Sequence, residues 1–80
     1  MLQSLLLPSQ TVCLRSPDDN ELVSAVALHP DFAQRSRNDL AVFVRTQADQ
    51  DNAVRLKMSR PMAGVYVDIV KRLVPNVSVS

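Results

Sequence analysis

This chain has neither the cysteines for an intrachain disulfide nor the cysteines and histidines for a structural zinc site. Its 80 residues contain one cysteine, Cys13, and one histidine, His29, so an intrachain disulfide and a Cys/His zinc site are both excluded. A domain of this size buries only about 60% of its unfolded surface and is marginally stable without a staple. We therefore expect residues 1–80 to form one domain that is stabilised either by a partner, most simply a second copy, or by a good core alone.

The composition is that of a globular protein and disfavours most enzyme chemistry. Hydrophobic residues make up 46% of the chain and charged residues 21%, which is typical of a folded domain. With a single glycine, Gly64, the chain has no glycine-rich phosphate loop, no dinucleotide-binding fingerprint and no nucleophile elbow. We predict a protein that is not an enzyme, with no cofactor, no metal and no small-molecule substrate.

The sequence shows no membrane span and no secretion signal. No apolar run approaches the roughly 18 residues that a span requires. Met1–Leu7 is rich in leucine, but it lacks a basic amino-terminal region and is followed by Pro8, so we do not expect a signal peptide. We expect residues 1–9 to pack on the core or against a neighbouring subunit. The unpaired cysteine suits a reducing compartment, which predicts a cytoplasmic or otherwise intracellular, non-secreted protein.

The segment before Pro30 predicts a strand followed by a helix. Apolar and polar residues alternate over 11–15, as in a half-buried strand. Ser16 and Pro17 are typical of a helix start, and the acids within 18–21 suit the positive end of the helix dipole better than a metal site. Pro30 removes a backbone donor, so we expect the helix to end there.

Two alternating segments predict a β-hairpin in the middle of the chain. Apolar residues alternate at Leu40, Val42 and Val44 within 40–46 and recur at alternate positions of 53–59. The polar stretch 47–52 lies between them and suits a hairpin turn. We therefore expect two adjacent antiparallel strands at 40–46 and 53–59.

The segment between Pro61 and Pro75 predicts a second helix. Apolar residues recur along it at helical spacing, at Met62, Val65, Tyr66, Ile69, Val70 and Leu73. The β-branched residues within 65–70 are also compatible with a strand, but the apolar stripe and the flanking prolines favour a helix. We assign Tyr66 to the core or to an interface, and we expect a final strand within 76–80.

The order of these elements, β-α-β-β-α-β, predicts a fold class. It is the order of the ferredoxin-like α+β sandwich, in which one antiparallel sheet carries both helices on one face. The alternative is an α+β fold with the same hairpin and an unpaired carboxyl-terminal tail.

On the predicted fold, the sheet face away from the helices carries four bases and one aromatic residue, with no acid. The predicted residues for binding a partner or a nucleic acid, including one that adjoins this face, are Arg15, Phe43, Arg45, Arg55, Lys57 and Arg60. RNA-recognition domains use the same face, where aromatic rings stack on bases. This chain departs from that pattern because Phe43 is its one aromatic on the face and 55–59 holds none.

Three hypotheses for function follow from these features. The leading one is a non-enzymatic protein-interaction or assembly module that associates with itself, because the chain is small and unstapled. The second is nucleic-acid binding through the basic face, since the net charge of +1 conceals a local excess of bases. The third is a small structural protein, or an inhibitor of a host protein, of the kind that phages and mobile elements carry.

Overall fold

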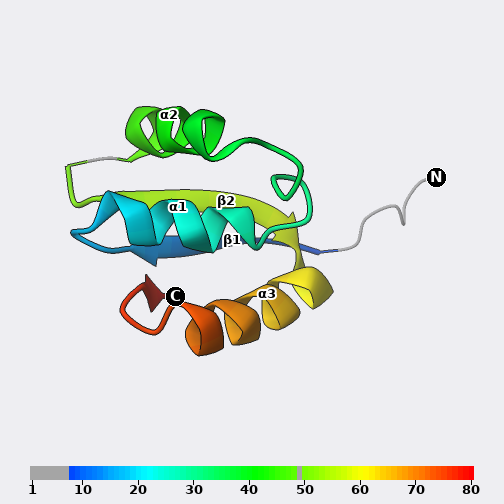
Figure 1. The fold of residues 1–80 in the computed structure, drawn as a ribbon. Helices are drawn as coiled ribbons and strands as arrows, with labels where there is room; N and C mark the ends of the chain where they lie inside the picture. The colour runs from blue at the N-terminus through cyan, green and yellow to red at the C-terminus, as the bar shows by residue number, and fades with distance from the viewer. Residues whose placement is uncertain (1–7, 49) are drawn as a thin grey trace.

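The computed structural model of the chain describes residues 8–48 and 50–80 (Figure 1). In chain order, the elements of these residues are β1 (Ser9–Arg15), α1 (Asp19–Ala27), α2 (Arg37–Gln47), β2 (Ala53–Ser59), α3 (Arg60–Leu73) and β3 (Ser78–Val79). The described part of the chain is therefore an α+β fold with a three-stranded antiparallel sheet and three helices.

The sheet has β1 at its centre, in the order β2-β1-β3, and β1 runs antiparallel to both neighbours. Val12 of β1 lies opposite Leu56 of β2, and both side chains are buried. The adjacent pair, Thr11 opposite Lys57, points to the other side and is exposed. Alternation along the two strands therefore produces one apolar face and one face that is open to solvent.

The three helices cover the apolar face, with α1 between α2 and α3 (Figure 1). Helix α2 contributes Leu40 and Val44 to the core, and α3 contributes Ala63, Tyr66 and Val70. The remaining core side chains come mainly from the strands and α1, at Val12, Leu14, Leu22, Val23, Ala25, Val26, Val54, Leu56, Met58, Val74 and Val77.

The prediction of a strand at 40–46 is wrong, because this segment lies within helix α2. The Ser36 side chain accepts a hydrogen bond from the Asp39 backbone N–H at 3.1 Å and so caps the helix. Leu40 and Val44 are spaced one helical turn apart and are buried together, whereas Val42 between them is 59% exposed. Positions four residues apart share one face in a helix as well as in a strand, and here capping and packing favour the helix.

The ferredoxin-like topology is therefore not the one observed, since the described residues contain three strands instead of four. With no strand at 40–46 there is no hairpin, and β2 pairs with β1 instead. The alternative with an unpaired tail is also wrong. β3 pairs with β1, and the backbone groups of Ser80 and Cys13 exchange two hydrogen bonds of 2.9 and 3.0 Å.

The ends of α1 and α3 follow the prolines largely as predicted. Helix α1 ends before Pro30, and α3 has Pro61 in its first turn and ends before Pro75. The predicted cap of α1 is displaced by two residues, because Asp18, not Ser16, accepts the hydrogen bond from the Asn20 N–H. The Ser16 N–H instead continues the pairing of β1 with the chain before β2, through the carbonyl of Asn52.

The predicted packing of residues 1–9 falls mostly on Met1–Leu7, which lie outside the described residues. Of the remainder, Ser9 begins β1 opposite Ser59. The carbonyl of Pro8 accepts a hydrogen bond of 2.8 Å from the backbone N–H of Arg60. The chain therefore enters the sheet beside the start of α3.

Candidate functional site

Helix α3 carries more apolar surface than the core covers. Its buried residues Ala63, Tyr66 and Val70 form one stripe along the helix. A second stripe, which we call the outer stripe, runs beside it at helical spacing and consists of Met62, Val65, Ile69 and Leu73. Three of these four are exposed, with Val65 at 61% and Leu73 at 65%. Apolar side chains on one face in this number are typical of a contact surface.

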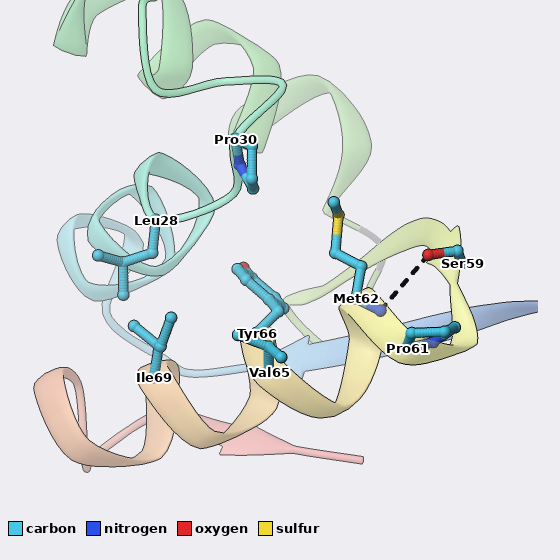
Figure 2. A pocket seen from close by; sticks show the side chains of 8 residues that line it. All are labelled: Leu28, Pro30, Ser59, Pro61, Met62, Val65, Tyr66 and Ile69. Carbon is cyan, nitrogen blue, oxygen red and sulfur yellow. Dashed lines mark hydrogen bonds between the residues drawn. The ribbon is translucent and has the colours of Figure 1, made fainter.

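The amino-terminal half of the outer stripe opens into a pocket of about 420 Å³ (Figure 2). Five residues of α3 line it, at positions 61, 62, 65, 66 and 69. The other walls are Leu28 and Pro30, which follow α1, and Ser59, the last residue of β2. The lining is almost entirely apolar, so the pocket suits an apolar group.

Local sequence explains why the pocket has this shape. The Ser59 side chain accepts a hydrogen bond from the Met62 N–H at 3.4 Å, which starts α3 directly after β2 (Figure 2). Pro30 follows the end of α1 and keeps the chain from continuing as a helix across the pocket. Pro30 and Pro61 both line the pocket, one after α1 and the other in the first turn of α3 (Figure 2).

Tyr66 forms the floor of the pocket and joins α3 to α1. Its hydroxyl donates a hydrogen bond of 2.7 Å to the carbonyl of Ala25, and the residue is 1% exposed. Burial raises the pKa of this phenol well above its ordinary value, because the charged form would lose its hydration. The hydroxyl is therefore a neutral structural donor. Of the two places predicted for Tyr66, the core or an interface, the structure shows the core.

His29 packs behind Tyr66 and plays a structural part. The centroids of the two rings are 5.5 Å apart, and His29 is 2% exposed. Its Nδ1 accepts a hydrogen bond from the Asp31 backbone N–H at 3.0 Å, so the 3.9 Å approach of the Asp31 carboxylate to the same atom is not an ion pair. Its Nε2 is buried and has no hydrogen-bond partner among the described residues.

The open sheet face brings together three of the six predicted binding residues. Arg15 lies on β1, and Arg55 and Lys57 lie on β2, all with exposed side chains. Cys13, opposite Arg55, is half-buried. We call Arg15, Arg55 and Lys57 the basic strand face. Its cations are held on adjacent strands at alternate positions, as a half-buried sheet dictates.

The other three predicted residues lie elsewhere, which corrects their expected place on the sheet. Phe43 and Arg45 belong to α2, and Arg60 is the first residue of α3. The Phe43 ring packs against that of Phe32, with 4.9 Å between the centroids, and Phe32 also lies under Arg35. The basic strand face consequently has no aromatic ring on which a base could stack.

The described residues contain no group of three or more His, Cys, Asp or Glu side chains that could hold a metal ion. They also contain no helix that is both long and apolar enough to cross a membrane.

Comparison with known proteins identifies no relative. No protein family matches the chain, and neither a curated protein nor a solved structure matches it.

The sequence pattern contained the outer stripe but not the pocket. All four members of the stripe belong to the apolar set that predicted this helix, but six apolar positions over this length are ordinary for one core-facing stripe, so the pattern did not separate the buried from the exposed members. The walls at Leu28, Pro30 and Ser59 come from other parts of the chain and meet only in the tertiary structure.

Proposed function

We propose that the protein is a non-enzymatic interaction module that associates with itself through the apolar surface of α3. The observation that supports this proposal is the outer stripe. Of the four large hydrophobic side chains that are exposed in the described residues, three lie on this one surface, at Met62, Val65 and Leu73. Scattered exposed hydrophobic residues are ordinary, but a continuous row along one helix is a recognised mark of a protein interface.

Physical reasoning favours a second copy as the partner. An apolar surface gains about 25 cal/mol for each Å² that it removes from water, and a domain of this size has little other surface with which to add stability. A second copy supplies an identical stripe, so a two-fold contact covers both at once. The charged side chains at the border, Asp68 and Arg72, carry opposite signs and do not oppose such pairing.

Sedimentation velocity over a range from low to high micromolar concentration tests the proposal. We expect the mass to rise from that of a monomer, 8.9 kDa, towards twice this value as the concentration increases. Val65→Asp places a charge in the outer stripe and is expected to keep the protein monomeric over the same range.

Val42→Asp is the matched control for this variant. Val42 is 59% exposed on α2, on the far side of α1 from α3 (Figure 1). The two substitutions change the same residue type at nearly the same exposure, so only their location differs. A wild-type protein that stays monomeric at every concentration, or equal effects of the two variants, would contradict the proposal.

A second candidate function is nucleic-acid binding, which one observation favours. Arg15, Arg55 and Lys57 share an exposed face, as expected of residues that contact phosphates. We propose titration of a fluorescent single-stranded oligonucleotide at two salt concentrations. Binding that weakens with salt, and that Arg55→Ala and Lys57→Ala both reduce while Lys71→Ala on α3 does not, would support this function. Affinity that does not change with salt would exclude it.

A further inference from the structure

Four of the five α3 residues that line the pocket have the spacing of a coiled-coil hole. Met62, Val65, Tyr66 and Ile69 stand at positions i, i+3, i+4 and i+7. In packed helices, four residues at this spacing surround one side chain, the knob, of the facing helix. Leu28 and Pro30 deepen this hole on the side of α1 (Figure 2). The pocket therefore has the form that receives a side chain from a second helix.

The same helix also carries an exposed side chain that could serve as a knob, Leu73. Leu73, at 65%, is the most exposed large hydrophobic side chain of the described residues. It lies on the outer stripe but does not line the pocket. It stands four residues, about 6 Å along the helix axis, beyond Ile69, which is the last α3 residue in the lining, so Leu73 leaves the pocket of its own chain unfilled.

We propose that two copies pair through antiparallel α3 helices and that Leu73 of each copy fills the pocket of the other. This inference rests on the proposed self-association and adds its geometry. The centre of the hole lies between Val65 and Tyr66, and the point midway from there to Leu73 is Ile69. A two-fold axis beside Ile69 consequently places each Leu73 over the opposite hole, so that neither pocket is complete without the other copy.

The charged border of the stripe fits the same axis. Asp68 and Arg72 are both exposed on one flank of α3, and neither forms an ion pair within the described residues. In an antiparallel pair of helices, each flank faces the same flank of its partner. With the axis at Ile69, Asp68 of one copy lies within roughly 2–3 Å, along the axis, of the level of the other copy's Arg72. Opposite charges thus meet twice, which supports this orientation over a parallel one.

Cysteine cross-linking measures the position of the axis. In a Cys13→Ser background, we expect Ile69→Cys to form a covalent dimer on mild oxidation, because a disulfide requires the two Cα atoms to lie within about 7 Å and only residues beside the axis meet their own copies so closely. Lys71 is exposed on the same helix, away from the stripe, so Lys71→Cys is the matched control. It is expected to give no such product at the same protein concentration.

Two further sets of variants test the contacts. Leu73→Ala removes a knob from both pockets and is expected to raise the dimer Kd by roughly tenfold or more. Asp68→Arg and Arg72→Asp are each expected to weaken the dimer several-fold, and the double exchange to restore it, because the opposite charges then meet again. Circular dichroism verifies that each variant retains its helices.

The outcomes separate this inference from the proposed function. A protein that remains monomeric at every concentration overturns both. If Val65→Asp disrupts the dimer, the proposed self-association is supported. The antiparallel arrangement alone is then overturned if Leu73→Ala leaves the dimer Kd unchanged, or if Lys71→Cys cross-links and Ile69→Cys does not. Cross-linking at Ile69 together with rescue by the double charge exchange supports the arrangement described here.

Discussion

The two apolar stripes of α3 lie side by side on one helix, but one is buried in the core and the other is largely exposed. The inner stripe, Ala63, Tyr66 and Val70, packs on the sheet and on α1 and is at most 1% exposed. The outer stripe contains the same kinds of residue, yet Val65 and Leu73 are more than half exposed. Hydrophobicity is thus not what distinguishes a folding surface from a contact surface in this chain. What distinguishes them is whether another element of the same chain lies opposite.

The inner stripe also contains a buried side-chain hydrogen bond that joins α3 to α1. The Tyr66 hydroxyl reaches the carbonyl of Ala25 in α1, so the helix is held by a directional bond as well as by apolar packing. Among the described residues, no side-chain hydrogen bond is made by a member of the outer stripe. The comparison therefore predicts that substitutions in the inner stripe affect folding, whereas those in the outer stripe affect association.

The largest expected effect on folding is that of Tyr66→Ala. This change empties a fully buried site and removes the bond to Ala25, so we expect the free energy of unfolding to fall by about 3–5 kcal/mol. Urea denaturation followed by circular dichroism measures it. A loss below about 1 kcal/mol would show that the inner stripe does not hold α3 in place.

A smaller effect is expected from Val70→Ala, which tests the inner stripe without any polar contact. Val70 is 0% exposed, and the change removes two buried carbon atoms, so we expect a loss of about 2 kcal/mol from transfer and cavity terms together. The same denaturation experiment applies, at a protein concentration where the chain is monomeric.

Tyr66→Phe is expected to cost about 1 kcal/mol at neutral pH, because it removes only the hydroxyl. The variant also separates two contributions to the free energy of unfolding, that of the hydrogen bond and that of the ionisation of the phenol. The folded state raises the pKa of Tyr66, so above about pH 10 the unfolded chain releases a proton that the folded chain retains. Wild-type stability is therefore complete below this pH and declines as the pH rises through it.

The Tyr66→Phe variant should lack this contribution to the alkaline decline. Because Tyr66 is the single tyrosine and the chain has no tryptophan, absorbance of the phenolate in the wild-type protein reports this residue alone. Ionisation of the folded protein at the ordinary pKa of a phenol would contradict the burial argument.

The smallest expected effect is that of Val65→Ala. It is the partner of Val70→Ala, with the same residue change five positions away on the same helix, at 61% instead of 0% exposure. We expect the free energy of unfolding of the monomer to change by less than about 0.5 kcal/mol, and alanine's higher helix propensity offsets part of any loss. A loss as large as that of Val70→Ala would mean that the two stripes are not functionally distinct.

The sequence pattern predicted some elements well because local signals and packing agree there. Strand β2 has the predicted bounds, and the prolines and the apolar stripe correctly identified α3 as a helix in spite of its β-branched residues. The prediction of a strand at 40–46 was wrong because an alternating pattern of so few residues fits the period of a helix as well as that of a strand. Only the burial of Leu40 together with Val44 decides between them.

The wrong prediction of a strand at 40–46 also explains why only part of the basic face was predicted correctly. Arg15, Arg55 and Lys57 belong to strands that exist, so alternation places them correctly on the exposed side. Phe43 and Arg45 were assigned to that face only through the strand that is absent. The binding role of all six residues stays a prediction.

By itself, the sequence determined that the chain is a small α+β domain without an intrachain disulfide, with helix limits near its prolines and an apolar stripe along the helix that follows Pro61. Those properties depend on local composition and spacing. Only the tertiary structure decided that β1 pairs with both β2 and β3, that 40–46 is helical, and that Leu28 and Pro30 meet α3 to enclose a pocket. The reason is physical, since these features depend on which distant segments cover one another, and the pattern of one segment does not specify its neighbours.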